Sequence, residues 1–368
     1  MKNFILTILL LSSGSAFAEP VDRAQTSSNA PEILVFSHMG AAAVFGADPA
    51  PNGWESTFTE NGFAFQMVRA ELAQEFGKHL ELLVDLEFTM RDVAIDSFQS
   101  NFKNLPGGLT VTAGYWGTNL GLENSRSPAI KTFVDSPLAL QRIFGARNQR
   151  SLGLAILLEP PTPWDLKLYA SVLSAADSES MRSWYGDADV SVESPTDMAA
   201  HFYLKNSGRV GDWALYFGLD AILGPNDSGR DNATNVFGVS VGLTLNPDNV
   251  NSGFRLDFES EWLLRRRQIP GGALQDLGGW AWVALHFLPE WTVAFRYEAT
   301  QGLENDPLDP LDDAWRSRST LSLGYRVLPH TRIRLSGVMD EGGPLEDPSY
   351  ATILHLEVGA ALSKTEAK

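Results

Sequence analysis

The sequence contains no cysteine, which excludes thiolate metal sites, cysteine nucleophiles and disulfide bonds. After its first residues it also has no apolar run approaching the roughly 18 residues that a transmembrane helix needs. Stability must therefore come from a large core or from the closure of a sheet. If the chain lies in a membrane, it must do so as a β-barrel.

Basic residues are outnumbered by acidic ones, giving a formal net charge of -17. A nucleic-acid-binding protein needs a basic surface, so this balance predicts no nucleic-acid partner. No linker or change of composition divides the chain, which favours a single domain.

The first residues resemble a secretory signal. Lys2 precedes an apolar run, and the small-residue ending Ala16-Phe17-Ala18 follows it. We expect a signal peptide at residues 1–18, cleavage before Glu19, and a short periplasmic segment at 19–32.

Strict alternation of apolar and polar residues is the dominant pattern of the remaining chain. In HLELLVDLEFTM, residues 79–90, Leu80, Leu82 and Val84 face one side, whereas Glu81 and Asp85 face the other. The same period of two recurs at residues 212–223, 236–245 and 253–264. Segments of about ten such residues are typical of tilted strands that cross a membrane.

Short turns and long polar loops alternate along the chain, as periplasmic turns and extracellular loops do in outer-membrane barrels. Long loops are expected near 47–61, 118–149, 176–196, 224–232, 265–276, 302–314 and 341–348. The alternation holds only if the segment 79–103 is divided near Met90 into two strands.

The resulting fold class is all-β: a transmembrane antiparallel β-barrel of about 16 strands over residues 33–362, followed by a C-terminal tail at 363–368. Strands are predicted near 33–46, 62–76, 79–90, 92–104, 108–117, 150–160, 163–175, 197–208, 212–223, 232–245, 252–264, 277–288, 291–301, 315–328, 331–340 and 349–362.

Tryptophan lies near many predicted strand ends, where amphipathic rings favour the membrane interface. These residues are Trp164, Trp213, Trp280, Trp291 and Trp315. Core aromatics of a soluble β protein are the alternative interpretation. A soluble sandwich, however, would carry charges on its outward face, and here one face of most strands carries almost none.

The longest connection, residues 118–149, mixes charged and apolar side chains and is too apolar for a disordered segment. We expect it to fold into the lumen as a constriction loop; packing on the outer rim is the alternative. Its candidate residues are Glu123, Arg126, Lys131, Asp135 and Arg142.

The run LTVTAGYWGTNLGLENSRSPAIKTFVDSPLAL, residues 109–140, resembles the phosphate-selective porin O/P group of outer-membrane barrels. The matching residues are Gly114, Trp116, Leu120, Gly121, Glu123, Asn124, Ser125, Ser127 and Phe133. The resemblance implies a sixteen-stranded barrel, commonly trimeric, with this loop narrowing the channel. Asn119-Leu120 replaces the usual Pro-Phe, and the lysine-rich pattern is reduced, so phosphate selectivity is not carried over.

Charges of opposite sign are separated on the predicted lumen face. A basic wall comprises Arg296, Arg316, Arg318, Arg326, Arg332 and Arg334, and an acidic wall comprises Glu81, Asp85, Glu87, Asp212, Asp220, Asp257, Glu259 and Glu261. Two interpretations are open. The walls produce a transverse field across a narrow pore, or neighbouring charges simply pair with one another.

Other candidate sites are weak. The six histidines lie in no local motif, the acidic loop 304–313 does not match a calcium-binding loop, and the basic run Leu264–Arg267 is short. We therefore expect no catalytic residues, no metal and no cofactor.

The sequence as a whole predicts a porin of a Gram-negative outer membrane, with small hydrophilic or charged solutes diffusing passively through it. Membrane lipid and lipopolysaccharide are the expected surroundings, and a homotrimer is the expected assembly. A closed barrel acting as surface scaffold or adhesin is one alternative, and an outer-membrane enzyme is another.

Overall fold

The computed structural model describes residues 32–46, 61–90, 93–118, 120–124, 126, 131–145, 149–175, 198–226, 232–248, 253–301, 314–328, 331–342 and 347–363. The predicted signal peptide, the acidic loop 304–313 and the tail beyond residue 363 lie outside these ranges.

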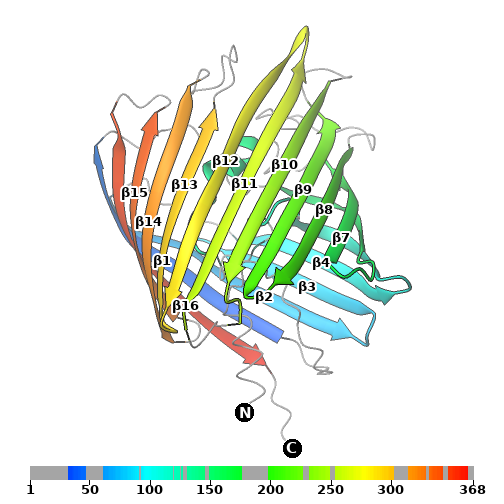
Figure 1. Ribbon diagram of the computed structural model, residues 1–368, viewed down its shortest axis with the longest axis horizontal. Coiled ribbons are helices and arrows are strands. Elements are labelled where there is room, and N and C mark those ends of the chain that lie inside the picture. Colours follow the sequence, from blue (N-terminus) through cyan, green and yellow to red (C-terminus); the bar gives the residue numbers. More distant parts are fainter. Residues whose placement is uncertain are drawn as a thin grey trace, which may run out of the picture.

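Within the described residues, sixteen antiparallel strands form one closed barrel, in which consecutive strands pair with each other and the first pairs with the last (Figure 1). The strands are β1 (Glu32–Gly46), β2 (Gly62–Phe76), β3 (Leu80–Phe88), β4 (Val93–Leu105), β5 (Leu109–Gly117), β6 (Arg150–Leu158), β7 (Asp165–Ser174), β8 (Met198–Val210), β9 (Trp213–Pro225), β10 (Ala233–Leu245), β11 (Arg255–Ile269), β12 (Gly272–Phe287), β13 (Trp291–Gln301), β14 (Trp315–Leu328), β15 (Thr331–Gly342) and β16 (Ser349–Ser363). The predicted fold class is confirmed.

The first and last strands close the barrel along their full length. Their register runs from Glu32 opposite Ser363 to Gly46 opposite Ser349. No backbone edge is left at this seam, so the barrel satisfies its own backbone hydrogen bonds, as a lipid environment requires.

The alternation in the sequence becomes an outer and an inner face. The outer face carries exposed apolar side chains at every second position, among them Phe217, Leu219, Val239, Phe295, Leu321 and Leu335. Positions between them point inward and are buried, as with Arg255, Asp257, Glu259 and Glu261 in β11. An apolar exterior with a polar interior is the arrangement of a membrane barrel and the reverse of a soluble protein.

One predicted loop is wrong. Residues 265–276 continue β11 and β12 as a long hairpin, with a tight turn at Pro270-Gly271. The hairpin persists because the alternation continues: inward-facing Arg265 lies opposite Asp276 and donates to both of its oxygens at 2.9 and 2.7 Å. The basic run at 264–267 therefore belongs to a strand.

Four of the five tryptophans lie at strand ends as predicted, and one does not; their position at a membrane interface stays a prediction. Trp213, Trp291 and Trp315 begin strands, and Trp164 immediately precedes β7. Trp280 lies in the middle of β12 and is buried, because that strand starts earlier than expected.

Among the described residues, no helix has the length and apolar character to cross a bilayer.

The outer face allows a prediction about how deep each residue lies in the membrane. Val239 lies at the centre of β10 and Val210 at the turn end of β8, both on the outer face. Val239→Arg should destabilise the folded barrel by about 2–4 kcal/mol, and the matched Val210→Arg by about 0–1 kcal/mol. Denaturant titration in lipid vesicles measures both. Equal losses would contradict a membrane-embedded belt centred on Val239.

Candidate channel interior

All six residues of the predicted basic wall lie on inward-facing positions of β13, β14 and β15. The wall is largely neutralised. Arg316 and Arg318 both bond Asp340, at 2.6 and 2.8 Å, and Arg296 lies 2.8 Å from Glu298. Lumen carboxylates from the adjacent strand, as with Asp340, and from the same strand, as with Glu298, therefore pair with these arginines.

The described residues of the connection 118–149 enter the barrel, and those from residue 131 onward contact the basic wall. Asp135 accepts hydrogen bonds from Arg296 at 2.7 Å and from Arg318 at 3.1 Å. Burial alone would raise the pKa of the Asp135 carboxyl, but these two guanidinium groups outweigh burial and hold the pKa below its ordinary value. The attachment is consequently present above the ordinary carboxyl pKa and is lost only as pH falls through the lowered one.

A short helix, α2 (Leu138–Phe144), continues this contact, and all its residues are buried. Its first N–H, on Leu138, donates to Glu298 Oε2 at 2.6 Å, and Arg142 near its end donates to Asp276 at 2.8 Å. Asp276 thus receives Arg142 from the loop as well as Arg265 from β11. The helix is held against β12 and β13 at both ends.

Apolar packing accompanies these ion pairs. Phe133 lies against Trp282, with ring centroids 6.4 Å apart, and the Arg296 guanidinium lies 4.5 Å from the Phe133 ring centre. Leu140 and Phe144 belong to the same buried cluster. The loop therefore has a core of its own inside the barrel.

The first half of the loop contacts the acidic wall. Leu122 N–H donates to Glu261 Oε2 at 3.0 Å, and Arg126 donates to Glu259 at 2.6 Å. Burial would lower the pKa of Arg126, but Glu259 and Glu123 outweigh it, so its pKa lies above the ordinary value. Lys205 from β8 donates to the Gly121 carbonyl at 2.8 Å.

The base of the loop is closed by Asn124. Its amide donates to the Thr118 carbonyl at 2.7 Å and to the Gln149 carbonyl at 3.0 Å, joining the two ends of the connection. Lys131 lies further along, and its carbonyl accepts from Arg332 and Arg334, each at 3.1 Å. The prediction that this loop folds into the lumen is confirmed.

The five predicted loop residues all take part in this attachment. Glu123 bonds Arg126 at 3.1 Å and Lys131 at 3.3 Å within the loop, and Arg126, Asp135 and Arg142 reach the barrel wall. The wall contacts described go to β8 and to β11, β12, β13, β14 and β15, on one side of the barrel.

The opposite side of the barrel carries the rest of the acidic wall. Glu81 bonds Lys103 at 2.9 Å, and Asp85 accepts from Arg69 at 3.3 Å and from Ser97 at 2.6 Å. Part of this wall is more open to solvent: Asp85 is 22% exposed, whereas Glu259 is 0% exposed; Glu81 and Arg69 are buried. Asp212 does not reach the lumen, because it lies exposed in the turn before β9.

Several lumen contacts were not foreseen from the sequence. Arg69 and Arg150 both bind Asp96, from strands distant in the sequence. Three histidines contact carboxylates: His201 with Asp220 at 3.3 Å, His286 with Asp257 at 2.9 Å, and His355 with Glu357 at 3.5 Å. The only available signal was alternation, which predicts the facing side of each residue and not its neighbour across the sheet.

No protein-family model matches the chain, and no curated protein is similar to it in sequence. Solved structures do resemble its fold. The outer membrane channel DcaP of Acinetobacter baumannii has a TM-score of 0.59 at 12% identity, over 90% of this chain and 97% of that one. An anion-selective porin from Comamonas acidovorans has a TM-score of 0.58 at 10% identity, over 90% and 99%.

OmpT, an outer membrane protein of Vibrio cholerae solved in a trimer form, has a TM-score of 0.54 at 9% identity, over 90% of this chain and 100% of that one. At these identities the likeness concerns the fold alone. The barrel shares its architecture with outer-membrane porins, and membership of the narrower phosphate-selective group stays a prediction.

Gly121 generates a prediction about loop attachment. Its backbone has φ +57°, and a Cβ there would lie 1.8 Å from Glu261 Oε1. Gly121→Ala should therefore displace the loop from Glu261 and lower the free energy of unfolding by about 1–3 kcal/mol beyond the cost of the backbone conformation.

Gly107→Ala is the matched control, because Gly107 has φ +80° and nothing within 4 Å of its Cβ position. Denaturant unfolding in detergent compares the two variants. Equal losses would show that the contact between Gly121 and Glu261 does not hold the loop.

Proposed function

We propose that the protein is an outer-membrane channel through which small hydrophilic or charged solutes diffuse passively. The observation that carries the proposal is the combination of a closed sixteen-stranded barrel, an apolar exterior and a charged interior into which one loop folds. Barrels of this strand number leave an aqueous space that eight strands would fill with side chains. Diffusion needs no energy source and no catalytic group, and we infer that the protein is not an enzyme.

The passage is proposed to run between the loop and the wall formed by β2, β3 and β4. The two arginines that bond Asp135 of the loop are sealed: Arg296 is 1% exposed and Arg318 2%. On the far side, Glu71 is 18%, Lys103 31% and Glu75 37% exposed. This gradient of exposure supports an aqueous path beside the far wall.

The predicted walls then contribute unequally to ion choice. Most of the basic wall is paired with carboxylates beneath the loop. Along the proposed path the acidic Glu71, Glu75 and Asp85 outnumber the basic Arg69 and Lys103 with which they pair, which leaves an acidic excess. Fixed charges beside a narrow aqueous passage concentrate ions of opposite sign. We therefore propose a weak preference for cations, with the paired walls mainly fixing the loop.

The surroundings follow from the same fold. The apolar belt supports an outer-membrane location in contact with lipid and lipopolysaccharide. Residues 1–18 would serve as the signal peptide that directs export and is then cleaved. A homotrimer is supported by the trimer form of OmpT. Membership of the phosphate-selective group rests on residues 109–140 alone; Gly114 fits that pattern, since a Cβ there would lie 2.0 Å from the Phe98 carbonyl oxygen.

Single-channel recording in planar bilayers tests the channel. The full chain should give stepwise conductance, and a variant lacking residues 122–142 should give larger steps, because the described residues of that segment lie inside the barrel. Heat-modifiable gel mobility verifies that both are folded. Folded barrels without conductance in either form would overturn the proposal and favour a surface scaffold whose loops bind a partner.

The proposed path generates a prediction about ion choice. Under a salt gradient, the double variant Glu71→Gln, Glu75→Gln should reduce the cation-to-anion permeability ratio by about a factor of two, since a solvated charge several ångströms from an ion contributes about 0.5 kcal/mol. Asp248→Asn, in an exposed turn, is the matched control and should leave the reversal potential unchanged. An unchanged ratio in the double variant would place the path elsewhere.

A further inference from the structure

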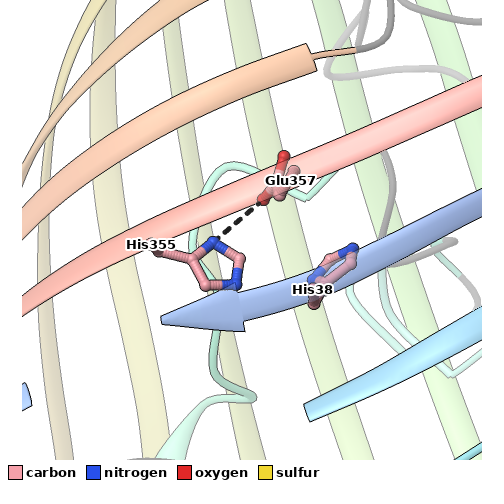
Figure 2. A group of neighbouring side chains, drawn as sticks. All are labelled: His38, His355 and Glu357. Atoms are coloured by element: carbon pink, nitrogen blue, oxygen red, sulfur yellow. Dashed lines mark ion pairs between the residues drawn. The ribbon is translucent and has the colours of Figure 1, made fainter. Parts of the chain in front are cut away.

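A cluster of potential metal ligands lies at the seam where the first and last strands meet. His38 comes from β1, and His355 and Glu357 come from β16 (Figure 2). All three are buried, and each offers one ligand atom within 4.8 Å of the other two. These residues belong neither to the predicted walls nor to the loop.

The register of the seam brings the three side chains together. His38 pairs directly with Glu357 across the seam, and His355 lies two residues before Glu357 on the same inward face. The rings of His38 and His355 lie 5.2 Å apart, centre to centre. Because the ligands are separated by more than 300 positions in the chain, no spacing motif in the sequence could indicate them.

The chemistry of these donors points to a transition metal. Two imidazoles and a carboxylate suit Zn²⁺, Cu²⁺ and related ions, and three protein ligands leave a further position open. His355 Nδ1 lies 3.5 Å from Glu357 Oε1. Two ligand atoms on a tetrahedral zinc ion, with bonds of about 2.1 Å, are separated by about 3.4 Å.

The environment of His38 also indicates a ligand at this site. Its side chain is 97% buried, and its Nε2 has no hydrogen-bond partner among the described residues. A buried polar atom without a partner is costly, and a metal ion would satisfy it. We propose that His38, His355 and Glu357 bind one divalent transition-metal ion on the lumen wall, where it joins β1 to β16.

Two guanidinium groups next to the site oppose a cation. Arg332 donates to Glu357 Oε2 at 2.6 Å, and Arg334 Nη2 lies 3.1 Å from Oε1, the oxygen that faces His355. Arg334 also donates to the Lys131 carbonyl, so Arg334 keeps one hydrogen-bond partner when a metal ion takes Glu357 Oε1. A metal ion and Arg334 would therefore compete for Glu357 Oε1, and removal of Arg334 should strengthen metal binding.

The test uses the folded, full-length protein in detergent, stripped with a chelator and then titrated with Zn²⁺ by calorimetry. One ion should bind per chain. His38→Ala and His355→Ala should each weaken binding at least about tenfold, whereas His79→Ala, at an exposed turn, should not change it. Arg334→Gln should tighten binding about tenfold, an effect that a folding defect would not produce.

A spectroscopic measurement identifies the ligands. Cu²⁺ bound to the chelator-stripped protein should show electron paramagnetic resonance coupling to two imidazole nitrogens, reduced to one in His38→Ala. Gel mobility before and after heating establishes that each variant is folded. Absence of stoichiometric binding in the folded protein, or binding unaffected by either histidine substitution, would overturn the site; neither result bears on conductance, so the channel and the metal site fail separately.

Discussion

Backbone hydrogen bonding across the seam is the constraint on which the rest of the structure depends. In hydrocarbon no water satisfies an exposed strand edge, so a sheet of this kind is stable only when its first and last strands pair. β1 and β16 do so over fifteen residue pairs. Once the sheet is closed, alternate side chains have only two destinations, lipid or lumen, and the sequence pattern follows directly from that division.

Closure creates a second problem inside the barrel. The inner wall carries many arginines and carboxylates, and charges removed from water are costly unless they are paired. The inward loop supplies part of the solution. Asp135 neutralises Arg296 and Arg318, while Arg126 and Arg142 neutralise Glu259 and Asp276. Loop and wall thus stabilise one another, and the loop attaches where its charges complement those of the wall.

Alternation and turn composition were sufficient to predict the strand number, the facing of most lumen residues and the inward loop. The prediction of a loop at 265–276 is wrong. Pro270 and two glycines favour a loop, but the segment continues to alternate, and the hairpin follows the alternation. Helix α2 was missed, although the run Leu138–Phe144 is rich in helix formers after Pro137. Contacts across strands, such as that between His38 and Glu357, depend on register, which a single sequence does not encode locally.

The pairing of β1 with β16 also constrains how the chain folds. Glu32 and Ser363 are partners although nearly the whole chain separates them, so the contact of greatest sequence separation is also the one that removes the final pair of open edges. Bringing such distant segments together carries the largest loop-closure entropy of any pairing in the barrel. The first strand must therefore wait, with its edge unprotected, until the last has been synthesised. In that interval the open edge can pair with the strand edge of another chain, so the unclosed sheet is prone to aggregation.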